Sequence, residues 1–241
     1  GIRCKWADGG DYRGGLIMKL GILTSIFGNY NFEQVLDMTS EFGLECMEVA
    51  CWPQGEGERR YAGVCHIDCE NFTDEEAHTI INKCEEKKIF ISALGFYANL
   101  MDENLEKRKE NIQHFMKVID VSAKLNINMV TGFLGRMQHK TLEENLKAVK
   151  EIWTPIIHYA ESKKVRIAIE NCPMLFTQDE WPGGQNIMTS PDNWRKIFEI
   201  LPFGSIISTP TMIYLGKLST GQILKGLGLQ IIWIGVFMFF S

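Results

Sequence analysis

The chain has 241 residues, of which 45% are hydrophobic and 23% charged, a composition typical of one large globular domain. A formal net charge of −5, without a long run of lysine and arginine, excludes the basic face that nucleic-acid binding requires. Seven cysteines stand at spacings that match no zinc finger, so we expect reduced thiols in a cytoplasmic protein.

The charges are distributed unevenly along the chain. All thirty acidic residues precede position 200, the last being Glu199, whereas Ile200 to Ser241 carries only Lys217 and Lys225. The glycine-rich start has no apolar signal-peptide core, and Met18 is the expected natural start. We therefore divide the chain into a loose leader (1–17), a folded domain (18–202) and an apolar, acid-free tail (203–241).

Five apolar runs of β-forming residues alternate with five amphipathic segments of helical periodicity. The predicted strands are 19–25, 45–50, 89–97, 127–133 and 165–170. The predicted helices are 31–42, a segment capped by Thr73, 102–125, 141–163 and a segment that starts at Ser190-Pro191. Strict alternation of this kind predicts a parallel sheet covered by helices.

Two parallel architectures are compatible with this alternation. A doubly wound sheet usually shows a glycine-rich phosphate loop after its first strand, and here only Gly28-Asn29-Tyr30 stands there. A (β/α) TIM barrel is therefore favoured, with five of the eight units recognisable. The fold is expected to be incomplete or aberrant after the fifth β-α unit.

Two strands end in acidic side chains. Glu170 ends the fifth strand and Glu48 lies near the end of the second. Parallel strands present their functional residues at their carboxyl ends, so both glutamates are candidate site residues. For each, the alternative is an internal salt bridge with a neighbouring basic side chain.

The loops at the same end of the predicted sheet supply four further substrate-binding candidates. His66 lies in the long loop 51–72 beside Asp68, which can orient its ring, and a purely structural role is the alternative. Arg136 follows the fourth strand and can meet an anion or pair with a barrel carboxylate. Asn171 follows Glu170, and Trp181 in a Trp-Pro-Gly-Gly turn can form an apolar wall against a sugar ring or cap the barrel.

Residues 18–202 resemble the xylose-isomerase-like barrels known as the sugar phosphate isomerase/epimerase family. The stretches that carry the resemblance include GLECMEVACWP, ISALGFYANL and RIAIENCPMLFTQDEWPGGQNI. The resemblance implies a TIM barrel of carbohydrate metabolism with one divalent metal, often Mn²⁺, held by Glu, Asp, His and Glu. Glu170 matches the first of these ligands, and in the epimerases that residue is also one of two acid/base carboxylates. Such a metal polarises a carbonyl and stabilises an enediolate.

The tail departs from the family pattern. If Pro210 aligns with the proline of the family, Thr209 replaces the aspartate ligand and Met212 replaces a histidine. No histidine follows His158, so Glu170 is the one recognisable metal ligand. A frameshifted or chimeric tail, a genuine but divergent tail, and a membrane anchor at Gly226–Phe240 are the three explanations. The anchor is disfavoured because the apolar run is shorter than the roughly 20 residues that span a bilayer.

We therefore expect a metal-dependent isomerase or epimerase that moves a proton next to the carbonyl of a sugar or keto-sugar. The alternatives are a non-catalytic carbohydrate-binding barrel that has lost its metal site, and a lyase acting on 3-keto-glycosides. The expected partner is a small sugar, with no nucleic acid and no membrane. Because unpaired strands leave open edges, homo-oligomerisation is also expected.

Overall fold

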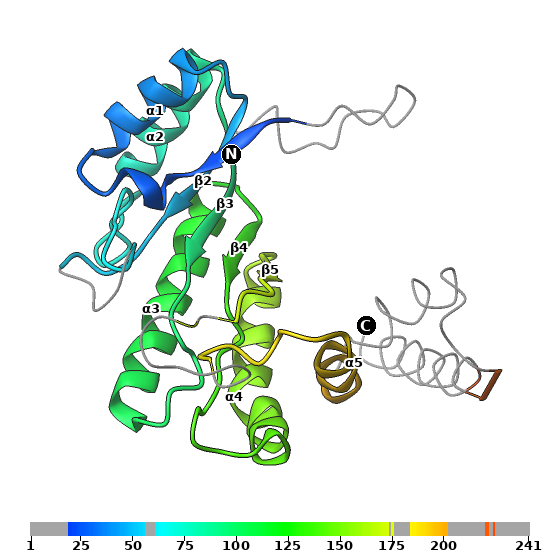
Figure 1. Ribbon diagram of the computed structural model, residues 1–241. Coiled ribbons are helices and arrows are strands. Elements are labelled where there is room, and N and C mark those ends of the chain that lie inside the picture. The colour runs from blue at the N-terminus through cyan, green and yellow to red at the C-terminus, as the bar shows by residue number, and fades with distance from the viewer. Residues whose placement is uncertain are drawn as a thin grey trace.

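The computed structural model describes residues 19–55, 61–173, 175, 184–201, 220, 221 and 224. Five strands form one parallel sheet, and each crossover between strands contains a helix (Figure 1). The strands are β1 (Gly21–Leu23), β2 (Cys46–Ala50), β3 (Phe90–Phe96), β4 (Met129–Gly132) and β5 (Arg166–Ile169). The helices are η1 (Thr24–Phe27, a 3₁₀ turn), α1 (Phe32–Glu41), α2 (Asp74–Lys87), α3 (Leu105–Lys124), α4 (Leu142–Ser162) and α5 (Pro191–Ile200).

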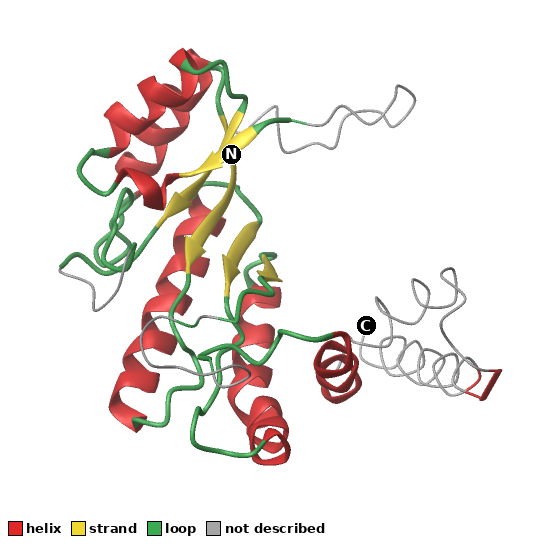
Figure 2. Ribbon diagram, in the orientation of Figure 1, coloured by secondary structure: helices red, strands yellow, loops and turns green. Residues whose placement is uncertain are grey.

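The order of the strands identifies the type of winding. Spatial order equals chain order, β1-β2-β3-β4-β5, with every neighbouring pair parallel. A doubly wound sheet reverses its direction of growth at a switch point, whereas a barrel grows one way with its helices on the outside. Figure 2 shows the strands beside the helices that connect them. The described part of the chain is thus a partial TIM barrel, as the sequence predicted.

The face of the sheet that packs on the helices is the apolar core. Val49, Leu94 and Val130 are register neighbours on three successive strands, and each is fully buried. The aromatic rings of Phe115 on α3 and Trp153 on α4 cover this face and contact each other, their centroids 6.1 Å apart. Because side chains alternate along a strand, the residues between these positions point to the opposite face, which is the interior of a barrel.

The predicted helix boundaries rest on capping groups that the structure confirms. Thr73 and Thr141 form capping boxes with Glu76 and Glu144, and the Ser190 side chain accepts from the backbone N–H of Asn193. Gly43 ends α1 with φ +68°, where its N–H donates to the Ser40 carbonyl and the next N–H donates to Thr39. This is a Schellman ending, and it needs a residue that tolerates positive φ.

Two of the predicted boundaries that differ from the structure have clear local causes. The first strand ends at Leu23 instead of residue 25, because residues 24–27 turn into η1. The third helix begins at Leu105 instead of Asp102, because the side chain of Asn104 caps it and Asp102 accepts from the Asn104 N–H. Asparagine and aspartate both form such local turns, so the sequence did not determine which one starts the helix.

Some of the predictions concern residues outside the described part of the chain. They are those for the leader 1–17, Trp181, Thr209, Met212, the proposed anchor Gly226–Phe240 and nearly all of the tail 203–241. Within the residues that the structure does describe, no helix has both the length and the apolarity needed to cross a membrane.

Candidate functional site

Three polar side chains meet at the barrel-interior face of the sheet, near the carboxyl ends of the strands, and the carboxyl group of Glu170 is close enough to interact with the charge of Glu48. Glu48 lies in β2 between the buried Met47 and Val49, so its side chain points away from the helices. Thr131 lies in β4, and Tyr97 and Glu170 directly follow β3 and β5. We call Glu48, Tyr97, Thr131 and Glu170 the carboxylate–hydroxyl cluster.

Two hydroxyl groups converge on one carboxylate oxygen. The Thr131 hydroxyl donates to Glu48 Oε1 over 2.5 Å, and the Tyr97 hydroxyl donates to the same oxygen. The Tyr97 and Thr131 oxygens are 3.1 Å apart. Hydrogen bonds to an ionised group are among the stronger ones in proteins, so the two hydroxyls hold the Glu48 carboxylate in one orientation.

A glycine and a bulge make room for this arrangement. A Cβ added to Gly95 would lie 2.8 Å from Glu48 Oε1 and 3.2 Å from Thr131 Oγ1, so a larger residue would collide with the cluster. The pairing of β2 with β3 shifts between Met47 and Glu48, which leaves Ser92 without a register partner. The bulge sets Glu48 opposite the small Ala93, and bulges commonly re-aim side chains beside functional sites.

The surroundings within the cluster shift the pKa values of Glu170 and Tyr97. Glu170 as a residue is exposed, but the protein removes part of the water around its carboxylate. This loss of solvation and, second, the negative charge of Glu48 raise the pKa of Glu170. Burial and the same Glu48 charge raise the pKa of Tyr97 well above its usual range, so Tyr97 keeps its proton and stays a donor.

Backbone bonds fix the position of Glu170. Its N–H donates to the Gly132 carbonyl over 3.0 Å, which extends the β4–β5 ladder by one residue. The Glu170 carbonyl accepts from the side-chain amide of Asn186 over 2.9 Å, and the same amide donates to the Cys172 carbonyl over 2.8 Å. Asn186 is 1% exposed, so it ties the far end of the β5–α5 loop to the residues around Glu170.

Two other predicted residues lie in loops at this end of the sheet. Asn171 is exposed and follows Glu170 beyond the end of β5. Arg136 is half-buried, with its N–H donating to Asn99 Oδ1 and its carbonyl accepting from Asn99 Nδ2, each over 2.8 Å. Gly135 has φ +93° and lies too close to Asn99 for any side chain. The prediction that Arg136 and Asn171 bind substrate stays a prediction.

His66 forms its hydrogen bonds within the fold. Thr24 Oγ1 accepts from the Ala50 N–H and lies 2.9 Å from His66 Nδ1, and His66 Nε2 lies 3.3 Å from the Phe27 carbonyl. These partners indicate an Nε2–H tautomer. Burial lowers the pKa of His66, which favours the neutral ring. The expectation that Asp68 orients the ring was wrong, because Thr24 and Phe27 do so and Asp68 accepts from Gln54.

The structure thus brings together Glu48 and Glu170 but not all six predicted residues. His66 lines a different hollow of about 640 Å³ between the N-terminal ends of α1 and α2, and no cluster residue contributes to that lining. The substrate-binding role of His66 stays a prediction, and Trp181 lies outside the described residues.

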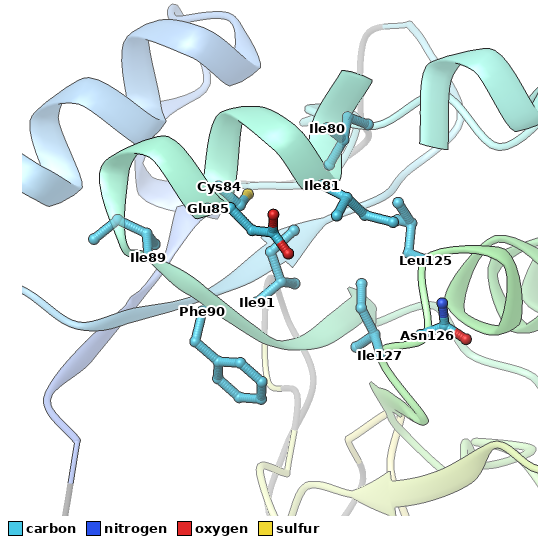
Figure 3. A pocket seen from close by; sticks show the side chains of 10 residues that line it. All are labelled: Ile80, Ile81, Cys84, Glu85, Ile89, Phe90, Ile91, Leu125, Asn126 and Ile127. Carbon is cyan, nitrogen blue, oxygen red and sulfur yellow. The ribbon is translucent and has the colours of Figure 1, made fainter. Parts of the chain in front are cut away.

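A small apolar cavity lies elsewhere in the fold. Figure 3 shows its side chains, which come from α2, the start of β3 and the α3–β4 turn. The cavity measures about 50 Å³ and lies at the amino ends of the strands, which in TIM barrels serve stability and not catalysis. We therefore interpret it as a packing gap between α2 and α3.

Sequence reasoning missed Tyr97, Thr131, Gly95 and Asn186. Tyr97, the final residue of IFISALGFY, continues the period-2 spacing of Ala93 and Gly95, which indicates that the three residues share one face of the strand. The bulge at Ser92 determines whether this face is the core or the barrel interior, and nothing in the local sequence predicts the bulge. Asn186 stands in a polar loop that contains no distinguishing pattern.

A parallel sheet wound in one direction, with its polar cluster near the carboxyl ends of the strands, defines a protein of the TIM-barrel class. The model of the xylose isomerase-like TIM barrel family matches residues 36–203, which is more than half of the chain. The chain belongs to this family. No curated protein matches the sequence.

Solved structures of similar fold include sugar-converting enzymes. A Rhodospirillum rubrum protein provisionally named a xylose isomerase is 14% identical, with a TM-score of 0.57 over 76% of this chain and 61% of its own. An L-ribulose 3-epimerase is 12% identical, with a TM-score of 0.54 over 76% and 57%. A Sinorhizobium meliloti protein is 15% identical, with a TM-score of 0.53 over 76% and 60%. The chain matches less than two thirds of each structure, and the likeness is one of fold.

The described residues do not form a site that fits the metal implied by the family resemblance. Among the described side chains, no three or more His, Cys, Asp and Glu residues are grouped so that they can hold an ion. Beyond Glu199 this sequence contains no Asp, Glu, His or Cys at all. A hard cation such as Mn²⁺ requires several oxygen ligands, and among the described side chains Glu170 with Glu48 supplies too few.

Proposed function

We propose that this chain acts on a sugar or keto-sugar and moves a proton at the carbon next to the carbonyl group. The carboxylate–hydroxyl cluster supports the proposal because it places two carboxyl groups with different surroundings on one face. Family membership supports the same class of reaction, since an L-ribulose 3-epimerase shares the fold.

Glu170 is the proposed acid/base residue. Its raised pKa brings its titration nearer to neutral pH, where a general base is most effective. In the proposed step the Glu170 carboxylate removes the proton from the carbon beside the carbonyl, which leaves an enediolate. Returning the proton to the former carbonyl carbon, with a hydroxyl proton moving between the two oxygens, isomerises the sugar, whereas delivery of a proton by a second group to the opposite face of the original carbon epimerises it.

Glu48 is the proposed second carboxylate. In the described part of the chain, both hydroxyl donors use Glu48 Oε1, so Oε2 is the oxygen proposed to meet a sugar hydroxyl. Tyr97 stays protonated and keeps the Glu48 carboxylate in place while the charge of the substrate changes. Positioning of this kind lowers the cost of reorganisation during the reaction.

A non-catalytic carbohydrate-binding barrel is the second candidate. The lack of a fitting donor set for a divalent metal among the described residues favours it, because the enediolate would then have no cation beside it. The described residues therefore give no support to the manganese dependence that the family resemblance implies.

Exchange of the carbon-bound proton tests the proposal without knowledge of the product. Keto-pentoses and keto-hexoses would be incubated with the protein in D₂O, and loss of the proton signal beside the carbonyl would be followed by NMR. We expect exchange that falls by about 10²-fold or more in Glu170→Gln. Glu143→Gln, on the exposed face of α4, is the matched control and should leave the rate unchanged.

Each outcome separates the two candidates. Equal exchange in the parent and in Glu170→Gln would overturn the role of Glu170. Saturable sugar binding without exchange, weakened in Glu48→Gln, would identify the non-catalytic binding barrel instead.

A further inference from the structure

The end of β2 pairs with the long loop that follows it, and two cysteines face each other at the junction. Cys51 and Cys65 form an isolated antiparallel bridge. The flanking bonds run from the His66 N–H to the Ala50 carbonyl over 3.0 Å and from the Trp52 N–H to the Val64 carbonyl over 3.2 Å. Cys51 and Cys65 therefore occupy the non-hydrogen-bonded position of an antiparallel pair.

This position brings two side chains unusually close. Residues opposite each other in a non-hydrogen-bonded pair have Cα atoms about 4.5 Å apart, with side chains on the same face. Disulfides join residues whose Cα atoms are roughly 4.4–6.8 Å apart. A pair in this position therefore falls within the range of Cα separations that a disulfide can join.

The backbone at Cys51 is held firmly. Its N–H donates to the Gly95 carbonyl over 2.9 Å, and its carbonyl accepts from His114 Nε2 over 2.7 Å. Cys51 is fully buried and Cys65 is half-buried, and all described cysteines are free thiols. Cys65 is therefore the thiol that an oxidant reaches first, with Cys51 fixed behind it.

We propose that Cys51 and Cys65 form a reversible disulfide with low-molecular-weight disulfides as the oxidant, which joins the residue after β2 covalently to the backbone that pairs with it. Cys51 directly follows β2, so the bond would fix the backbone around Cys65 to the carboxyl end of this strand. The proposal does not depend on the proposed function.

The exchange proceeds in two balanced steps. The Cys65 thiolate attacks one sulfur of the small disulfide, which forms a mixed disulfide and releases one small thiolate. The Cys51 thiolate then attacks Cys65 Sγ, which forms the Cys51–Cys65 bond and expels the second small thiolate. Two protein thiols are oxidised, the small disulfide is reduced to two thiols, and the two protons pass to the thiolates released.

The surroundings set the rate of the first step. Burial and the charge of Asp68 raise the pKa of the Cys65 thiol to about 12, and burial also raises the pKa of Cys51. Only the thiolate attacks, so the rate should rise about tenfold per pH unit through the neutral and mildly alkaline range. The Cys69 thiol, which hydrogen-bonds with Cys51, is the competing partner.

The full chain would be incubated with oxidised glutathione at mildly alkaline pH, quenched with an alkylating agent and analysed by intact mass and peptide mapping. We expect the loss of two hydrogen atoms, a Cys51–Cys65 cross-linked peptide, and a melting temperature raised by about 6–12 °C that dithiothreitol reverses. Cys65→Ser should abolish the cross-link, whereas Cys69→Ser and the control Cys46→Ser should retain it.

Three results would overturn the proposal. They are a Cys51–Cys69 cross-link in the parent chain, glutathione adducts without an internal bond, and a bond that survives Cys65→Ser. Because the peptide map of the parent chain identifies the bonded pair by itself, the test holds even where one variant misfolds.

Discussion

Glu48 and Glu170 are both glutamates, but their carboxyl groups have different surroundings. The Glu48 carboxylate accepts from the hydroxyls of Thr131 and Tyr97, whereas the pKa of Glu170 is raised by lost solvation and by the charge of Glu48. A pair of carboxyl groups whose environments differ in this way is the usual basis for dividing acid and base roles. The division of roles therefore depends first on the lost solvation of Glu170 and second on the charge of Glu48.

Glu48→Gln should lower the pKa of Glu170 toward its ordinary value of 4.5 without restoring it fully. The substitution removes the like charge, but the larger cause, lost solvation, remains. The titration of Glu170 can be followed by NMR of ¹³C-labelled glutamate carboxyl groups in the two proteins. Glu143→Gln, far from the cluster on the exposed face of α4, should leave that titration in place.

The same shift has a consequence for stability. A carboxyl group whose pKa is raised in the folded state binds its proton more tightly there, so it stabilises the fold at low pH. This contribution is fully present below the ordinary pKa and is lost as the pH rises through the raised one. The free energy of unfolding should therefore fall over that window more steeply in the parent than in Glu48→Gln. An unchanged Glu170 titration in Glu48→Gln would contradict this account.

The sequence predicted the acids of the site but not the hydroxyls. Glu170 and Glu48 stand out because a charged residue interrupts an apolar run, and burying such a residue requires a reason. Tyr97 and Thr131 are ordinary β-formers, so nothing in their own strands marks them. Their meeting at Glu48 Oε1 depends on the register between three strands, which local sequence does not specify.

At the scale of elements, the β5–α5 connection shows why the site is rigid at one point. The Asn186 amide donates to the Glu170 and Cys172 carbonyls, so one side chain replaces the ladder that ends with β5. Existence and order of the elements followed from apolar periodicity and from caps such as Thr73 and Thr141. The hydrogen bonds of Asn186 could not be predicted in this way, because a single buried asparagine leaves no periodic pattern in the sequence.

Asn186→Ala should reduce the free energy of unfolding by about 2 kcal/mol, since the side chain loses its hydrogen bonds to the Glu170 and Cys172 carbonyls and from the Met188 N–H. Urea denaturation measures the loss. Asn193→Ala is the matched control, because its amide makes one bond, to the Ile187 carbonyl, in the same region. We expect about half the loss there. Equal losses in the two variants would show that Asn186 has no special role beside Glu170.

At the scale of the whole molecule, the family fold and the composition of this chain point in different directions. The family model covers residues 36–203, and the sheet winds as a barrel does. Among the described strands, β1 pairs with β2 alone and β5 with β4 alone, so the expected homo-oligomerisation stays a prediction. The sequence beyond Glu199 contains none of the side chains that usually bind hard cations.

This difference leads to a prediction about metal binding that needs no substrate. Calorimetric titration of the purified chain with Mn²⁺ should show no saturable binding at micromolar protein concentration. Glu170 and Glu48 offer two carboxylates, whereas manganese prefers about six oxygen ligands. The hydroxyl donors also occupy Glu48 Oε1.

A parallel titration of Glu170→Gln makes the result decisive. Weak, unsaturated heats that are identical in both proteins would mean that any chemistry of this chain relies on its own acid/base groups. Tight binding by the parent that Glu170→Gln abolishes would mean that backbone carbonyls or other oxygens complete a cage around Glu170. In that case the metal-dependent mechanism implied by the family resemblance would apply to this chain after all, and proton exchange should then depend on added manganese.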